Sequence, residues 1–89
     1  MYVYANERAY LFTEDGQSDF LAVRDAVGEL LKVAGVCNAD NVLRLAVEKL
    51  GAMDSWRALA SLDRLVEIGE LFEIPNPRSA AGQHRIFVR

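Results

Sequence analysis

The spacing of apolar residues along the chain changes twice and divides it into three stretches. In the middle stretch, apolar residues recur at steps of three and four, which is the period of a helix with one buried side. Three such segments follow one another at 18–34, 38–50 and 55–68. Gly35, Gly51 and Gly69 follow the segments, and glycine is the residue that most readily ends a helix in the left-handed conformation. The pattern therefore predicts three helices.

Polar residues indicate where these helices begin. Ser18 is a suitable N-cap for the first helix, and either Asn38 or Asp40 suits the second. The third follows the short turn 52–54 and begins at Ser55. The apolar stripes that we expect to meet in a core are Phe20, Val23, Val27, Leu30 and Leu31; Leu43, Ala46, Val47 and Leu50; and Ala58 or Leu59, Leu62, Leu65 and Val66.

Both ends of the chain have the composition of strands. Residues 2–13 are rich in aromatic and β-branched residues and predict a strand or short hairpin, ending at a turn over 14–16. Residues 71–74 and 84–88 predict two further strands, joined by the Pro-, Asn- and Ser-containing loop 75–83. The predicted fold class is α+β, in a single domain of residues 1–89 with three helices, a C-terminal β-hairpin and an extra N-terminal strand or hairpin.

The junction between the third helix and the hairpin resembles that of winged-helix domains, a version of the helix-turn-helix. The residues that carry the resemblance are Ala58, Leu62, Leu65, Gly69 and Leu71. The turn of about four residues before the third helix adds to it. The resemblance covers residues 18–89, with the helices at 18–69 and the wing hairpin at 70–89, and leaves 1–17 as an extension. It implies that the third helix is a recognition helix.

Charge is distributed unevenly along the chain. The net charge of −3 argues mildly against nucleic acid as a partner, because Lys and Arg supply most non-specific affinity for phosphates. Residues 1–75 carry seven basic and 13 acidic side chains, a balance of −6, whereas residues 76–89 carry three arginines and no acid. The predicted hairpin is thus the most basic part of the chain.

The winged-helix resemblance implies contacts with double-stranded DNA. The outward side of a recognition helix enters the major groove, and we expect Ala60 to lie there between polar residues. The wing would hold the phosphate backbone. The predicted DNA-binding residues are Ser55, Arg57, Ser61 and Arg64 on the helix, and Arg78, His84 and Arg85 on the hairpin. The alternative is a solvated helix surface on which Arg64 pairs with a nearby acid such as Glu67, and a hairpin whose charges protect an exposed edge.

The aromatic residues are expected to pack within the fold, and the alternative is that they form an interface with a partner. Trp56 is expected to cover the turn between the helices, the alternative being an exposed anchor for a partner protein. Tyr2, Tyr4 and Tyr10 are expected to pack on one side of a strand. If that side is uncovered, the aromatic N-terminal segment would form a homodimer surface.

The sequence offers no chemistry for catalysis. His84 has no Ser or Cys nucleophile at a recognisable spacing, Cys37 is expected to be a small buried residue, and the glycines are isolated. One His and one Cys do not make a zinc site, so no metal, cofactor or enzyme activity is expected.

Charges interrupt every apolar stretch, no basic and apolar leader opens the chain, and a lone cysteine suits a reducing compartment. We therefore expect a cytoplasmic protein without a membrane span.

Two functions follow as hypotheses. The first is a small DNA-binding transcriptional regulator that acts as a dimer, of a size that suits a phage or mobile element. The second is an acidic winged-helix module that binds proteins and not DNA, with the aromatic N-terminal segment and Trp56 as its partner surface.

Overall fold

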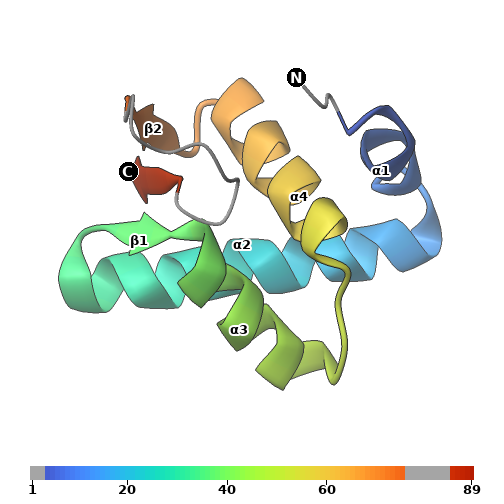
Figure 1. Cartoon of the computed structure of the whole chain (residues 1–89), viewed down its shortest axis with the longest axis horizontal. Coiled ribbons are helices and arrows are strands. Elements are labelled where there is room, and N and C mark those ends of the chain that lie inside the picture. Colours follow the sequence, from blue (N-terminus) through green and yellow to red (C-terminus); the bar gives the residue numbers. More distant parts are fainter. Residues whose placement is uncertain (1–3, 76–84) are drawn as a thin grey trace.

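The computed structural model describes residues 4–75 and 85–89, which form four helices and a small three-stranded sheet. Helix α2 spans the width of the molecule in Figure 1, with α1 at its N-terminal end, the sheet toward its C-terminal end, and α3 and α4 packed across it. The elements are α1 (Ala5–Tyr10), α2 (Glu14–Ala34), β1 (Cys37–Asn38), α3 (Ala39–Leu50), α4 (Ser55–Glu67), β2 (Phe72–Ile74) and β3 (Ile86–Val88). The fold class is α+β, as predicted.

The three predicted helices are present as α2, α3 and α4, and their predicted ends are confirmed to within a residue. Gly35, Gly51 and Gly69 follow them with φ of 75°, 86° and 80°, in the left-handed region that favours glycine. Asn38 caps α3, because its side-chain oxygen accepts a hydrogen bond of 2.8 Å from the backbone N–H of Asn41. The local signals at these helix ends are sufficient to place them.

Helix α2 begins four residues earlier than the sequence pattern indicates. Thr13 is its N-cap, and the Thr13 hydroxyl accepts a hydrogen bond of 3.0 Å from the N–H of Gly16. Glu14 and Asp15 lie in the first turn, where negative charge complements the helix dipole. The predictions of a turn over 14–16 and of an N-cap at Ser18 are therefore wrong, since the cap and the two acids outweigh the low helix propensity of Gly16.

The predicted N-terminal strand or hairpin is wrong over the residues that the structure describes. Ala5–Tyr10 form helix α1, and Tyr4 precedes it in the left-handed conformation, with φ of 55°. Four of the six residues, Ala5, Glu7, Arg8 and Ala9, have high helix propensity. The aromatic residues that suggested a strand pack against α4 instead of a neighbouring strand.

The sheet is antiparallel, with strand order β1-β3-β2. Its hairpin confirms the two predicted C-terminal strands in shorter form, whereas most of the loop between them lies outside the described residues. Strand β1 lies between the first two predicted helices, where the sequence predicts no strand. It pairs with β3 through Cys37 opposite Phe87 and Asn38 opposite Ile86, so the segment between α2 and α3 joins the sheet.

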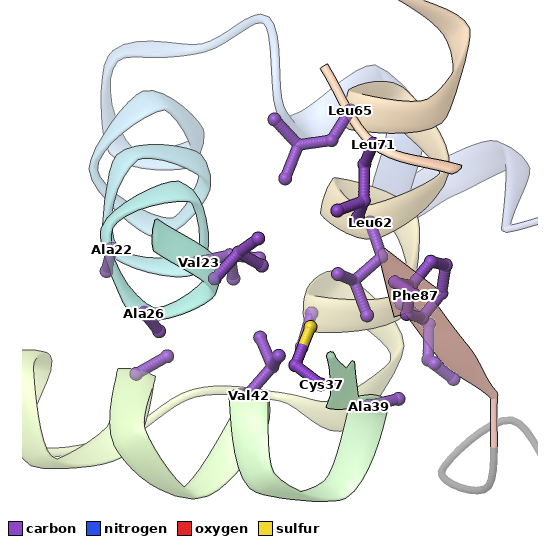
Figure 2. Close-up of a cluster of buried hydrophobic side chains, with 14 of the residues drawn as sticks. Ala22, Val23, Ala26, Cys37, Ala39, Val42, Leu62, Leu65, Leu71 and Phe87 are labelled. Carbon is purple, nitrogen blue, oxygen red and sulfur yellow. The ribbon is translucent and has the colours of Figure 1, made fainter. Parts of the chain in front are cut away.

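One core lies where α2, α3, α4 and the sheet meet. Figure 2 shows Val23, Val42, Leu62 and Phe87 converging from four different elements, and each is fully buried. The junction residues Leu62, Leu65 and Leu71 are at most 1% exposed, which confirms that this spacing returns the chain to its core. Leu50 was expected in the core but is 42% exposed, because it is the last residue of α3.

Candidate functional site on the outward side of helix α4

The middle of helix α4 is enclosed on every side. Its five consecutive residues from Ala58 to Leu62 are at most 7% exposed. Ala60 lies on the opposite side of the helix from Leu62, because two residues advance an α-helix by about 200°. Helix α1 contacts α4 (Figure 1). Arg57 and Arg64, three residues before and four residues after Ala60, lie on the same side of α4 as Ala60.

The expectation that Ala60 and Ser61 face outward is therefore wrong. Both have an exposed fraction of 0%. Ala60 lies on the side of α4 whose arginines contact the rings of Tyr10 and Phe12, and the Ser61 hydroxyl donates a hydrogen bond of 2.9 Å to the Arg57 carbonyl of its own helix. Ser55, the first residue of α4, is exposed as expected.

The two arginines predicted to read DNA are engaged within the chain. The guanidinium of Arg57 lies 3.9 Å from the centre of the Tyr10 ring and 3.7 Å from a carboxylate oxygen of Asp19. The guanidinium of Arg64 lies 5.6 Å from the centre of the Phe12 ring. Its Nη1 is 3.5 Å from Glu67, which confirms the alternative of a pair with a nearby acid. Each arginine thus stacks on a ring from the segment 4–12.

Further contacts of the same kind hold α1 to α4. The Arg8 guanidinium pairs with the Glu67 carboxylate, and the rings of Tyr4 and Trp56 are 5.7 Å apart between centroids. Helix α1 itself contributes no buried residue, although Leu11 directly after it is 2% exposed. The contact between α1 and α4 is therefore made of rings and charged groups at the surface.

We call this surface the aromatic–arginine face, and define it as Tyr4, Tyr10, Phe12, Trp56, Arg57 and Arg64. Two of its rings are open to solvent, since Phe12 is 70% exposed and Trp56 is 47% exposed. Cation–π contacts of this sort contribute about 0.5–1 kcal/mol each at exposed sites. Aromatic residues and arginine are also the types enriched at the centres of protein interfaces.

Arg85, predicted to contact phosphate, joins the sheet to α4. Its guanidinium lies 2.6 Å from Asp63 and 2.7 Å from Glu73, and its Nε donates a third hydrogen bond of 3.0 Å to Glu73. The side chain is 18% exposed. Burial lowers the pKa of Arg85, but the hydrogen bonds to Glu73 and Asp63 outweigh it and raise the pKa above the ordinary value. Two acids thus neutralise this arginine. Arg78 and His84, the remaining predicted contacts, lie outside the described residues.

Two other titratable groups have shifted pKa values. Burial raises the pKa of Asp19, and Asp15 and Asp54 add to the effect while Arg57 opposes it. Burial raises the pKa of the Cys37 thiol to about 11, which keeps it protonated and unreactive at neutral pH. Among residues 4–75 and 85–89, the ion-pair partner of Asp19 is Arg57.

Within residues 4–75 and 85–89, no three His, Cys, Asp or Glu side chains are grouped so that they could hold a metal ion. In the same part of the chain, no helix combines the length and the apolar character that crossing a bilayer requires.

Sequence reasoning missed the ring partners and acid partners of α4. Phe12, Arg8 and Asp19 were not singled out, although each contacts an arginine or a glutamate of α4. The one available signal was the polar run at 6–8, which interrupts strand-like alternation and suits a short helix.

Comparison of the chain with protein-family models, with curated proteins and with solved structures finds no match. Function is therefore inferred from the geometry of this chain alone.

Proposed function

We propose that this chain is a winged-helix module that binds another protein through the aromatic–arginine face. The order of elements supports the winged-helix part of the proposal: α3 and α4 are joined by the turn 51–54, and the hairpin of β2 and β3 follows α4 after Gly69. Strand β1, between α2 and α3, completes the sheet of the hairpin, an arrangement compatible with that family.

The enclosure of α4 is the observation that favours a protein partner. A helix that reads DNA needs one free side to enter the major groove. In α4 the residues from Ala58 to Leu62 are buried all round, and α1 lies over the outward side. Every predicted DNA-binding arginine within the described residues also has a carboxylate partner in the chain. A polyanion would have to displace both α1 and these acids.

The exposed rings of Phe12 and Trp56 offer apolar surface that a bound partner would bury. Phe12 and Trp56 lie toward opposite ends of α4, because Phe12 contacts Arg64 in the last turn of the helix whereas Trp56 belongs to its first turn. Between them the guanidinium groups of Arg57 and Arg64 stack on rings, so they are held in place before a partner arrives. Pre-ordered side chains lose less conformational entropy on binding.

A dimeric, DNA-binding transcriptional regulator remains the second candidate. It is favoured by one observation, the three arginines without an acid in residues 76–89. In that alternative, α1 leaves α4 so that Ser55, Arg57, Ser61 and Arg64 meet the major groove.

Titration of a labelled random-sequence duplex with the full chain separates the two candidates. For a protein-binding module we expect no change in fluorescence anisotropy even at low ionic strength. Binding that weakens steeply with salt would overturn the proposal, because counterion release marks contact with phosphates. It would do so most clearly if Arg57→Ala and Arg64→Ala abolish it while Arg44→Ala does not. Arg44 is a matched control on α3, with a side chain that is 77% exposed.

A further inference from the structure

Three shallow hollows lie end to end along one side of helix α2, with volumes of about 270, 390 and 410 Å³. Ile68 of the first hollow is followed directly by Gly69 of the second, and the second and third share Arg24 and Arg89. Helix α2 contributes eight lining residues: Gln17, Phe20, Arg24, Asp25, Val27, Gly28, Glu29 and Lys32. Five of them, Gln17, Phe20, Arg24, Gly28 and Lys32, recur at steps of three and four, which places these five on one side of the helix. We call the three hollows together the α2 groove.

One end of the groove is an apolar socket. Leu11, Phe12, Phe20 and Ile68 line it, with Arg64 and Gln17. Phe12 and Ile68 are 70% and 45% exposed, so their apolar surface faces solvent. Because Phe12 and Arg64 also belong to the aromatic–arginine face, the socket is continuous with that face. Its size suits one large apolar side chain.

The rest of the groove is cationic. Four basic side chains line the second and third hollows, against three acidic ones: Arg24, Lys32, Lys49 and Arg89 against Asp25, Glu29 and Glu70. With Arg64 at the socket, which pairs with Glu67, the lining has five cations and three anions in a chain whose net charge is −3. This excess of positive charge is complementary to an acidic ligand.

Two of the three acids are already used within the chain. Glu70 pairs with Arg24 at 2.6 Å, and Glu29 pairs with Lys49 at 2.8 Å. Lys32 and Arg89 have no acid partner among residues 4–75 and 85–89. The Arg24 side chain is 52% exposed, so a carboxylate from outside can exchange with Glu70 at low cost.

A glycine keeps the cationic end open. A Cβ added at Gly28 would have no neighbour nearer than Nη2 of Arg89, at 4.0 Å. The guanidinium of Arg89 therefore lies beside α2 at the position where the helix has no side chain. A carboxylate can approach this guanidinium along the helix surface.

We propose that the α2 groove binds an acidic segment of a partner protein, with an apolar side chain in the socket and carboxylates at Arg24 and Arg89. The proposal rests on the function proposed above and specifies the chemistry of the partner. A nucleic acid could bring negative charge to the same cations, but its backbone offers no apolar side chain for the socket, so a peptide fits both ends of the groove.

The test uses the full chain labelled with ¹⁵N and a set of synthetic peptides. Each peptide carries one Leu, Phe or Trp, with glutamates at increasing distance from it. We expect at least one to shift the amide signals of residues that line the groove, and added salt to weaken its binding. Lysine in place of the glutamates, or Ala in place of the apolar residue, should weaken binding at least tenfold. Arg24→Ala and Arg89→Ala should each do the same, whereas Arg44→Ala should change it less than twofold.

The outcomes distinguish this proposal from the broader one. If the peptides with lysine bind as well as those with glutamate, or if Arg24→Ala and Arg89→Ala leave binding unchanged in folded protein, the groove proposal is wrong. Shifts confined to the surroundings of Trp56 would also overturn it, while leaving a protein-binding aromatic–arginine face. Binding of random duplex DNA to the groove cations, with no peptide bound, would overturn both.

Discussion

The two sides of helix α4 are held by different forces. On the inner side, Leu62 and Leu65 are fully buried in a core without charged groups, and burial of apolar surface contributes about 25 cal/mol per Å². On the outer side, rings and half-exposed ion pairs such as Arg8–Glu67 hold α1 in place, and exposed pairs contribute about 0–1 kcal/mol each. The inner side therefore determines whether the protein folds. The outer side can exchange its contacts, which is a property that a binding surface needs.

The largest expected effect comes from the inner side. Leu62→Ala should lower the free energy of unfolding by about 3–5 kcal/mol, because it leaves a cavity in a core that has no solvent access. Phe12→Ala, on the outer side, removes a ring that is 70% exposed and should cost less than about 1 kcal/mol. Urea unfolding followed by circular dichroism measures both. Similar losses for the two variants would show that the contrast between the sides is wrong.

The sequence predicts the inner side well because its signals are local. The spacing of Leu62, Leu65, Gly69 and Leu71 alone indicates a helix that ends and returns to the core. The outer side depends on residues far apart in the sequence: Asp19 is 38 positions from Arg57, and no local pattern indicates that they pair.

The N-terminal segment and β1 show two further limits of sequence reasoning. Tyrosine favours strands, so Tyr4 and Tyr10 suggest a strand until their contacts with α4 are known. In addition, Cys37–Asn38 is too short a strand to show alternation. The charged residues of α4 can be identified from its helical period. Their acid and ring partners cannot, because those partners lie on other elements.

The second prediction tests the attachment of α1. A Cβ at Gly16 would overlap the backbone carbonyl of Tyr10, which cannot rotate away as a side chain could. Gly16→Ala should therefore displace α1 and cost about 1–3 kcal/mol, with a change in the fluorescence of Trp56. Gly28→Ala, in the same helix, meets nothing closer than 4.0 Å and should stabilise the protein by about 0.5–1 kcal/mol. If the two substitutions change stability in the same direction, Gly16 is not the point at which α1 is held.

The third prediction concerns the arginine between the sheet and α4. Arg85→Gln removes the shared cation of Asp63 and Glu73 and should cost about 1–2 kcal/mol, less than a fully buried pair because Glu73 is partly exposed. Arg89→Gln makes the same change of charge four residues away and should leave the free energy of unfolding within about 0.5 kcal/mol. If Arg85→Gln leaves stability unchanged, the pairs of Arg85 with Asp63 and Glu73 do not join the sheet to α4.

The smallest effect is expected from Asp19, a half-buried carboxylate of α2 that pairs with Arg57 on the outer side of α4. Because burial and the neighbouring Asp15 and Asp54 raise the pKa of Asp19 above 3.8, in spite of Arg57, ionised Asp19 makes the folded state less stable at neutral pH. This penalty is present above the folded-state pKa and is relieved as pH falls through that value toward 3.8. Asp19→Asn should therefore be no less stable than the parent chain at neutral pH, and its advantage should shrink as pH falls through this range.

Asp25→Asn, which replaces an exposed carboxylate on the same helix, is the matched control. Thermal unfolding of the three proteins between pH about 3.5 and 7 measures the difference. A loss of stability in Asp19→Asn at neutral pH would mean that the ion pair with Arg57 outweighs burial, and that this pair joins α2 to α4 more strongly than its partly exposed arginine indicates.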